Sequence, residues 1–321
     1  MKIGIIGTGV FGIAIASILH KNGNEITMWT AFKEELIDLE NNRVRKKLNN
    51  YKIPDEIKIT NDIEELCANK DIIYIAVPAK FVSVTCIRAI SYINNQHICI
   101  ASKGIEESSL MFLPDIIKQL FNTNRVGVIS GPTFAADITS NAPIGLSLAS
   151  YNPETSNIIY NSLDNNLVKM FITNDVIGTC ICGAFKNVLA IASGIINGLG
   201  YPISTQAMLI TQSLHDVKEL INKLGGTGST ILSFAGFGDI ILTCTSEKSR
   251  NYTLGKMIGS RVENSKINEY INDTTIEGLT ALRSFHNIIN DKNIDIPIIN
   301  LIYDIVYNKK NPDELTEFLT K

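Results

Sequence analysis

A short apolar strand that runs through a glycine-rich loop into an apolar helix is the feature that most constrains this fold. Residues 2–6 are branched and apolar, as in a buried parallel strand, and residues 13–19 favour a helix. Between them lies the loop Gly7-Thr8-Gly9-Val10-Phe11-Gly12. In this context the motif predicts a dinucleotide site: Gly7 allows a tight turn, Gly9 admits a pyrophosphate to backbone N–H groups, and Gly12 allows close helix packing. A plain glycine-rich turn is the alternative, which the flanking segments disfavour.

The size and charge of the chain favour a soluble enzyme. Its 321 residues are enough for about two domains with a sizeable core. The formal net charge of -3 gives no reason to expect nucleic acid as a partner. The apolar runs at 72–79 and 188–196 look too short or too interrupted to span a bilayer, and the N-terminus enters a strand without a signal-peptide pattern. We therefore expect a cytoplasmic protein without membrane insertion.

The cysteines suggest neither a metal site nor a disulfide framework. None of the six belongs to a Cys-x-x-Cys or Cys/His ligand pattern. We expect reduced, mostly buried thiols and no bound metal at Cys67, Cys86, Cys99, Cys180, Cys182 and Cys244.

The chain changes from alternating strands and helices to helices alone near residue 173. After the first strand, further strands are predicted at 25–29, 71–77, 97–102, 126–130, 144–149 and 168–172. Beyond residue 173, helical periodicity runs through 176–199, 204–224 and 276–290, and a last helix begins at Pro297. The fold class is therefore α/β: a Rossmann-type, doubly wound, mainly parallel sheet at 1–173, followed by an all-helical domain at 174–321.

Lys186 is the first candidate for chemistry outside the glycine loop. It lies in a helical segment of small and apolar residues, so partial burial is expected. Burial brings the pKa of an ammonium group toward neutrality, which suits a general acid or base for a carbonyl/alcohol pair. A lysine that extends from its helix to water is the alternative. Asn187 beside it offers a donor and an acceptor for orienting a substrate oxygen.

Two downstream segments offer partners for this lysine and for an anionic substrate. Asp239 and Thr243 are four residues apart, so on a helix they share one face; a helix-capping role is the alternative for Asp239. Ser249, Arg250 and Asn251 precede a helical run. The guanidinium fork of arginine matches phosphate geometry, and a helix N-terminus would reinforce it. A solvated loop is the alternative for this segment.

The order and spacing of these segments resemble a known family from end to end. The resemblance is carried by the N-terminal glycine motif, Ser102-Lys103-Gly104-Ile105-Glu106, Ser130-Gly131-Pro132-Thr133-Phe134-Ala135, Lys186-Asn187-Val188, Gly238-Asp239 with Leu242 to Ser246, Ser249-Arg250-Asn251, and Glu277-Gly278. The chain resembles the bacterial NAD(P)-dependent glycerol-3-phosphate dehydrogenases. The implied reaction is the reversible reduction of dihydroxyacetone phosphate to sn-glycerol 3-phosphate, which feeds phospholipid synthesis.

The resemblance also implies roles for individual residues. The residue matching the family's proton donor and acceptor is Lys186. Residues that would line the substrate site are Lys103, Gly131, Thr133, Asp239, Ser249, Arg250 and Asn251. Residues that would contact the cofactor include the glycine motif, with Thr8, Val10 and Phe11. Outside the motif they are Lys103, Ala135, Arg250, Thr275 and Glu277. Asn187, Asp239 and Thr243 are expected to orient the lysine and the substrate oxygens. The number of chains that assemble is left open, with a homodimer as one option.

The chain departs from the family pattern at the helix near residue 204 and after Trp29. Ser204, Gln206 and Gln212 replace an amide and two basic residues, which bears on rate and regulation more than on reaction type. Where relatives commonly place Arg or His two residues after the tryptophan, this chain has Ala31. No acidic residue or arginine directly follows the second strand, and the nearest cations are Lys33, Arg43, Arg45, Lys46 and Lys47. The sequence thus leaves the preference between NAD and NADP open, and the expectation is dual use.

Two other functions remain open at this stage. A related two-domain dehydrogenase of another hydroxy acid or sugar phosphate would share the Rossmann domain and a Lys-Asn element, but the Ser-Arg-Asn and Gly-Pro-Thr-Phe-Ala segments disfavour it. A non-catalytic sensor of NADH would have no use for a buried lysine combined with Asp239 and Arg250.

Overall fold

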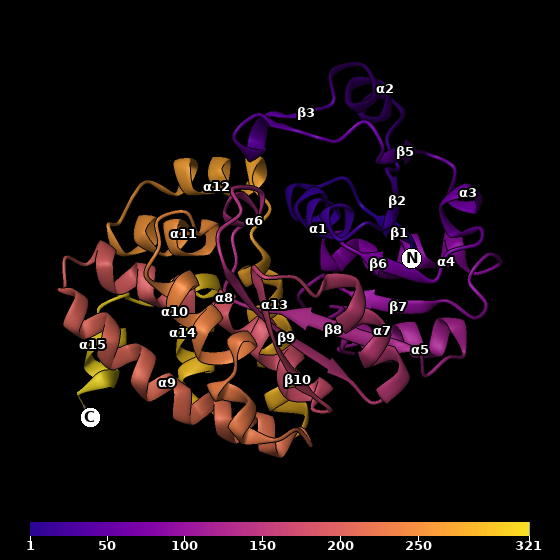
Figure 1. Ribbon diagram of the computed structural model, residues 1–321. Coiled ribbons are helices and arrows are strands. Elements are labelled where there is room, and N and C mark those ends of the chain that lie inside the picture. Colours follow the sequence, from indigo (N-terminus) through magenta and orange to yellow (C-terminus); the bar gives the residue numbers. More distant parts are fainter. Residues whose placement is uncertain (321) are drawn as a thin grey trace. The chain divides into compact units, whose positions relative to one another are not determined.

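The computed structural model describes residues 1–320 and divides them into two compact units (Figure 1). Unit 1 comprises residues 1–103 and 113–176, and unit 2 comprises residues 104–112 and those from 177 onward. The sequence suggested a single boundary at residue 173, whereas the segment 104–112 is part of unit 2. Ile105 is buried in the hydrophobic core of that unit, and Glu107 forms an ion pair with Arg283.

Unit 1 contains an eight-stranded sheet of the expected, mainly parallel type. The strand order is β10-β9-β8-β7-β6-β1-β2-β5, and every neighbouring pair is parallel except β8 and β9. The strands are β1 (Lys2–Ile6), β2 (Glu25–Trp29), β5 (Lys58–Thr60), β6 (Ile72–Ile75), β7 (His97–Ile100), β8 (Val126–Ser130), β9 (Ile144–Ser150) and β10 (Val168–Thr173). A separate antiparallel pair, β3 (Val44–Arg45) and β4 (Tyr51–Lys52), was not anticipated from the sequence.

The helices of unit 1 connect these strands and bury their apolar sides. They are α1 (Val10–Lys21), α2 (Lys33–Asn42), α3 (Ile63–Cys67), α4 (Val82–Ala89), α5 (Leu113–Phe121), α6 (Ala135–Thr139) and α7 (Pro153–Leu163). Ile5 of β1 lies opposite Met28 on one side and Tyr74 on the other, and all three are fully buried. They pack in one core with Ile13 and Leu19 of α1, so the first helix is held firmly against the sheet.

Unit 2 is helical, as the periodicity predicted. Its helices are α8 (Val176–Gly198), α9 (Ile203–Lys223), α10 (Asp239–Cys244), α11 (Arg250–Gly259), α12 (Asn264–Asp273), α13 (Glu277–Asp291), α14 (Pro297–Tyr307) and α15 (Glu314–Leu319). Between α9 and α10 lie two short segments, a 3-10 helix at Gly228–Leu232 and a π-type turn at Phe234–Gly238 that is kinked at Gly236.

Helix α8 is the central element of unit 2. It is long and apolar enough to cross a membrane by length and composition, which the interrupted apolar runs of the sequence did not suggest. However, 94% of its most apolar window is buried inside the protein. The burial of Phe185, Leu189 and Ile196 in the core of unit 2 accounts for this apolar character.

Close backbone contact joins α8 to α11. A Cβ built on Gly255 of α11 would lie 1.9 Å from the carbonyl oxygen of Ile191, and one on Gly194 of α8 would lie 2.1 Å from that of Tyr252. The two helices therefore approach more closely than any side chain would permit. This contact fixes the start of α11, and with it Ser249 and Arg250, relative to α8.

We expect Gly255→Ala to lower the melting temperature by roughly 2–4 °C, the shift that a net loss of about 1 kcal/mol gives in a large domain. An alanine normally stabilises a helix interior by about 1 kcal/mol relative to glycine, but here the added methyl group collides with backbone, and overpacking typically costs about 1–3 kcal/mol. Thermal unfolding followed by circular dichroism measures the change. Lys256→Ala is the control, since it removes only an exposed ion pair with Glu247 and should shift the midpoint much less. An unchanged or higher midpoint for Gly255→Ala would contradict the packing argument.

Candidate active site

The glycine loop of unit 1 has the geometry that a dinucleotide requires. Gly7 has a backbone φ of +119°, a value that residues with a side chain rarely adopt. Its N–H donates to the Trp29 carbonyl at 2.9 Å. A Cβ on Gly12 would lie 2.3 Å from the Gly7 carbonyl oxygen. A Cβ on Gly9, in contrast, would have no neighbour within 4 Å. The loop therefore needs Gly7 and Gly12 for its own shape, whereas Gly9 leaves open space at the N-terminus of α1, as an approaching anion needs.

A cavity of about 390 Å³ adjoins this loop within unit 1. Its apolar walls include Phe32, Phe81 and Val84, all of which are well exposed. Arg88 contributes a cation and lies with its guanidinium 5.0 Å from the centre of the Trp29 ring. An exposed apolar cavity beside a phosphate-type loop suits a planar base, so the residues of unit 1 fit the adenosine half of a dinucleotide.

The same cavity contains two charged residues whose role the sequence did not reveal. Glu35 lies in the first turn of α2 and Arg45 lies in β3, and both line the cavity. The sequence analysis looked for an acidic residue only directly after Trp29, and Glu35 is six residues beyond that tryptophan. The relevant signal was an acidic residue in the first turn of a helix that follows the strand. Among the cations expected there, Lys33 is exposed and Arg43 instead donates to the backbone carbonyls of Pro54 and Ile57.

A larger cavity of about 620 Å³ lies at the opposite ends of the strands in unit 1. It is lined by residues that include Lys70, Asp71, His97 and Arg125. Lys70 and Asp71 precede β6, and Arg125 precedes β8, so this cavity faces the amino ends of strands. Parallel sheets bind their ligands at the carboxyl ends, and we therefore place the cofactor at the smaller cavity.

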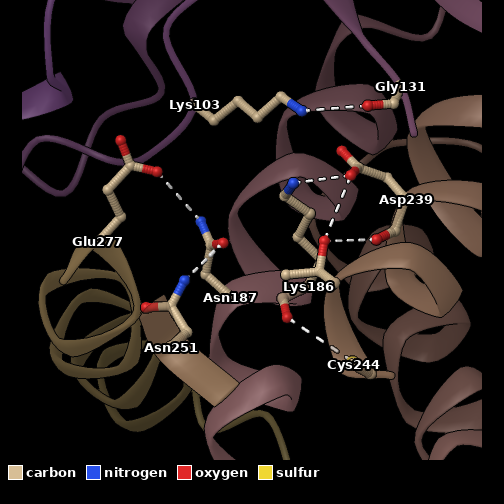
Figure 2. A network of polar contacts seen from close by, with 9 residues as sticks. Lys103, Gly131, Lys186, Asn187, Asp239, Cys244, Asn251 and Glu277 are labelled. Atoms are coloured by element: carbon tan, nitrogen blue, oxygen red, sulfur yellow. Dashed lines mark hydrogen bonds and ion pairs between the residues drawn. The ribbon is translucent and has the colours of Figure 1, made fainter. Parts of the chain in front are cut away.

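The segment around Gly131 brings several polar groups together at the carboxyl end of β8. The Lys103 ammonium donates to the Gly131 carbonyl at 3.4 Å (Figure 2). A Cβ on Gly131 would lie 2.3 Å from the Gly145 carbonyl oxygen, so only glycine fits. The hydroxyl oxygens of Ser130 and Thr133 are buried and have no hydrogen-bond partner within residues 1–320. Buried hydroxyls without a partner are uncommon, so these two are candidates for contact with a bound ligand.

The centre of the candidate site in unit 2 is a buried ion pair. The Lys186 ammonium of α8 lies 2.7 Å from the Asp239 carboxylate, the first residue of α10. The two side chains are 11% and 1% exposed. Thr243 lies one turn farther along α10, as its four-residue spacing predicts, and its hydroxyl donates to the backbone carbonyl of Asp239 at 2.6 Å. The expected burial of Lys186 is confirmed, and the alternative of a lysine extended to water is wrong because its charge is paired inside the protein.

Asn187 belongs to a second hydrogen-bond network rather than to the ion pair. Its amide oxygen accepts from the Asn251 side chain at 2.9 Å, and its amide N–H donates to the Glu277 carboxylate at 3.4 Å (Figure 2). Asn251 in turn accepts from the Gly278 N–H at 2.9 Å. No hydrogen bond joins Asn187 to Lys186 within the described part of the chain. The network ties α8 to α11 and α13, so Asn187 and Asn251 support the site by holding three helices in register.

The predicted phosphate-binding segment forms the start of helix α11. The Ser249 hydroxyl caps the helix by accepting from the Tyr252 N–H at 3.3 Å. Arg250 follows as the first helical residue and is exposed. Thr275 is likewise exposed, two residues before Glu277 begins α13. The solvated-loop alternative is wrong for this segment, which presents an arginine at a helix N-terminus.

The remaining expected positions lie in the first turns of their helices. Val10 and Phe11 begin α1, and Ala135 begins α6; all three are partly exposed. The thiols of all six cysteines are buried and unpaired with one another, as expected. Burial raises the pKa of Cys67 and of Cys86 to about 12, so neither thiol is a nucleophile at neutral pH.

Comparison with known proteins gives consistent matches over the whole chain. The family model described as NAD-dependent glycerol-3-phosphate dehydrogenase N-terminus matches residues 2–156, and the corresponding C-terminus model matches residues 175–317. The glycerol-3-phosphate dehydrogenase [NAD(P)+] of Fusobacterium nucleatum is 35% identical, over 98% of this chain and 95% of that protein. The glycerol-3-phosphate dehydrogenase [NAD(P)+] of a Thermoanaerobacter species is 33% identical, over 98% of this chain and 95% of that protein. The crystal structure of glycerol-3-phosphate dehydrogenase from Coxiella burnetii superposes on this chain with a TM-score of 0.93 at 28% sequence identity. The match covers 100% of this chain and 98% of the Coxiella chain.

We expect Gly9→Ala to weaken NADH binding at least about tenfold without destabilising the protein. The backbone at Gly9 (φ -62°, ψ 169°) is open to alanine, and the added methyl group meets no protein atom but occupies the space at the start of α1. Quenching of protein fluorescence by NADH measures the affinity. Gly12→Ala is the contrasting variant, because its methyl group collides with Gly7 and should lower the melting temperature. Wild-type affinity in Gly9→Ala would show that the pyrophosphate lies elsewhere.

Proposed function

Because the chain belongs to the NAD-dependent glycerol-3-phosphate dehydrogenase family, we propose that it catalyses the reversible NAD(P)H-dependent reduction of dihydroxyacetone phosphate to sn-glycerol 3-phosphate. The observation that carries this proposal is the buried ion pair of Lys186 and Asp239, 2.7 Å apart. A buried charge pair is costly to desolvate, and such pairs are characteristic of sites that move protons. We assign dinucleotide binding to residues 1–173 and substrate binding with catalysis to residues 174–321.

The cofactor would be held by the glycine loop and the cavity beside it. Backbone N–H groups at the start of α1 bind the pyrophosphate beside Gly9, and the apolar cavity takes the adenine. Further contacts come from Thr8, Val10, Phe11, Lys103, Ala135, Arg250, Thr275 and Glu277. When bound, the reduced nicotinamide supplies the hydride for the ketone carbon.

Lys186 is the proposed acid and base. In the reductive direction its ammonium donates a proton to the oxygen of the former carbonyl group, and in the oxidative direction the amine takes that proton back. Asp239 holds the ammonium nitrogen in place, and the Thr243 hydroxyl anchors the backbone of Asp239. Because the proton donor is already in position, no free energy is spent on reorganising the site when charge develops on the substrate oxygen. Lysine thereby supplies the positive charge that other enzymes obtain from a metal ion.

The phosphate group of the substrate would be bound at the start of α11. Arg250 offers a bidentate fork, and the helix N-terminus beside Ser249 adds backbone donors. Lys103 and the unpaired hydroxyl of Thr133, beside Gly131, would contact the other polar groups of the substrate. Asn251 contributes indirectly, through the network that positions Asn187. Holding the phosphate uses binding energy far from the reacting carbon to align that carbon.

The proposal places the enzyme in the cytoplasm, where its product supplies phospholipid synthesis. The burial of α8 in the core of unit 2 supports a chain that does not insert into membranes. The net charge of -3 supports small molecules rather than nucleic acid as partners. A homodimer is the assembly that we would test first, by light scattering.

We expect Lys186→Ala to lower kcat for dihydroxyacetone phosphate by about two to four orders of magnitude, the scale of general acid–base catalysis. Steady-state NADH oxidation measures the loss. Lys186→Ala removes the countercharge of the buried Asp239 carboxylate, and breaking a buried ion pair in this way costs about 3–5 kcal/mol. The double variant Lys186→Met/Asp239→Asn, which keeps the site neutral, is the control for folding. NADH binding in unit 1 should persist in both, and near-normal turnover by either folded variant would overturn the role of Lys186.

We expect Arg250→Ala to raise KM for dihydroxyacetone phosphate by about ten- to a hundredfold, because a charge-assisted contact is lost. The weak activity on unphosphorylated dihydroxyacetone should change little. Comparison of kcat/KM for the two substrates isolates the phosphate contribution. Lys248→Ala removes one positive charge two residues away and should change the ratio less than about threefold. Equal losses on both substrates in Arg250→Ala would place this residue at the cofactor or in the structure instead.

A further inference from the structure

The carboxylate of Glu35 is held in a fixed position at the cofactor cavity. One of its oxygens accepts from the Thr8 hydroxyl at 2.8 Å and from the Thr30 hydroxyl at 2.7 Å. The other oxygen lies 2.7 Å from a guanidinium nitrogen of Arg45. Thr8 belongs to the glycine loop, and Thr30 directly follows β2. Glu35 therefore joins the two backbone segments that flank the ribose of a dinucleotide in this type of fold.

This carboxylate is negatively charged at neutral pH. Burial alone would raise the pKa of Glu35, but hydrogen bonds from Thr30, Thr8 and Arg45 outweigh it and hold the pKa below its usual value. The side chain is 24% exposed, so it remains accessible from the cavity that it lines. A carboxylate has about four acceptor positions, and the three bonds described leave room for another donor.

Arg45 would be the competing determinant, since an arginine can hold a 2′-phosphate. Its guanidinium is already paired with Glu35 at 2.7 Å, and its side chain is 23% exposed. The pair has no net charge, so Arg45 itself brings no excess positive charge to the cavity. A phosphate dianion would have to separate Arg45 from Glu35 and then remain close to the freed carboxylate.

We propose that Glu35 accepts a hydrogen bond from the adenosine ribose 2′-hydroxyl and disfavours a 2′-phosphate, so that the enzyme prefers NADH to NADPH. This inference rests on the proposed function only in requiring a dinucleotide at the glycine loop. It revises the expectation of dual use, which looked for an acidic residue only directly after Trp29. Glu35 lies in the next helix and reaches the site because α2 begins four residues after β2 ends.

The test measures nucleotide binding rather than turnover. Dissociation constants for NADH and NADPH are determined by fluorescence titration, and those for 5′-AMP and adenosine 2′,5′-bisphosphate by calorimetry, because these two probes lack the nicotinamide. We expect the wild-type protein to bind NADH at least about tenfold more tightly than NADPH, a difference of about 1.4 kcal/mol. The 5′-AMP and bisphosphate pair should show the same order.

Glu35→Gln keeps the size and an acceptor oxygen but removes the negative charge. We expect it to reduce the NADH preference at least about tenfold, partly through tighter NADPH binding. Glu34→Gln is the matched control: it makes the same charge change on the neighbouring residue, which is exposed and does not line the cavity. This control should leave the ratio of the two constants within about twofold of wild type.

Three outcomes would overturn the inference: equal or tighter NADPH binding by the wild-type protein, an unchanged ratio in Glu35→Gln, or the same shift in Glu34→Gln. Failure of the proposed function looks different. If the nucleotides bind as expected but dihydroxyacetone phosphate is not reduced, the reaction assignment fails and the role of Glu35 stands. If neither NADH nor NADPH binds, both fail.

Discussion

The rigid packing of helices around the Lys186–Asp239 ion pair is the constraint on which the candidate site of unit 2 depends. Two charges lose their hydration there, and the loss is tolerated only because the partners meet at 2.7 Å in a rigid setting. The setting consists of α8, whose apolar residues fill the core, and α10, which begins at Asp239 after a π-helical turn. Helices that are this well packed cannot relax to separate the charges, so the ammonium nitrogen has one defined position.

Close backbone packing extends this rigidity to the other functional segments of unit 2. The glycines at the contact of α8 and α11 bring the two helices together without intervening side chains. Asn187 and Asn251 bridge the same helices, and Glu277 extends the bridge to α13. The residues proposed to touch substrate and those that align helices are thus neighbours in sequence. Lys186 is the proposed acid and base, whereas its neighbour Asn187 bridges helices.

Around the glycine loop of unit 1, residues that shape the backbone and residues proposed to bind ligand are likewise close neighbours in sequence. Gly7 and Gly12 are required by the backbone itself, whereas the open space beside Gly9 leaves room for the proposed ligand. The Thr8 hydroxyl within this loop also donates to Glu35, so the proposed phosphate-binding element holds a carboxylate in place at the same cavity. Ser130 and Thr133 supply buried hydroxyls without protein partners. Candidate binding groups in the described part of this unit can therefore be recognised as buried polar groups that lack a hydrogen-bond partner.

The sequence by itself determined the features that depend on nearby residues. Strand and helix positions, the conformations required of the glycine loop and the burial of Lys186 follow from periodicity and from neighbours a few residues away. The pairing of Lys186 with Asp239, 53 residues apart, and of Asn187 with Glu277, 90 apart, was decided by the tertiary structure. So were the position of Glu35 at the cavity and the inclusion of residues 104–112 in unit 2. Such contacts depend on how complete elements pack against one another, and no local pattern encodes which distant side chain will fill the space beside a given group.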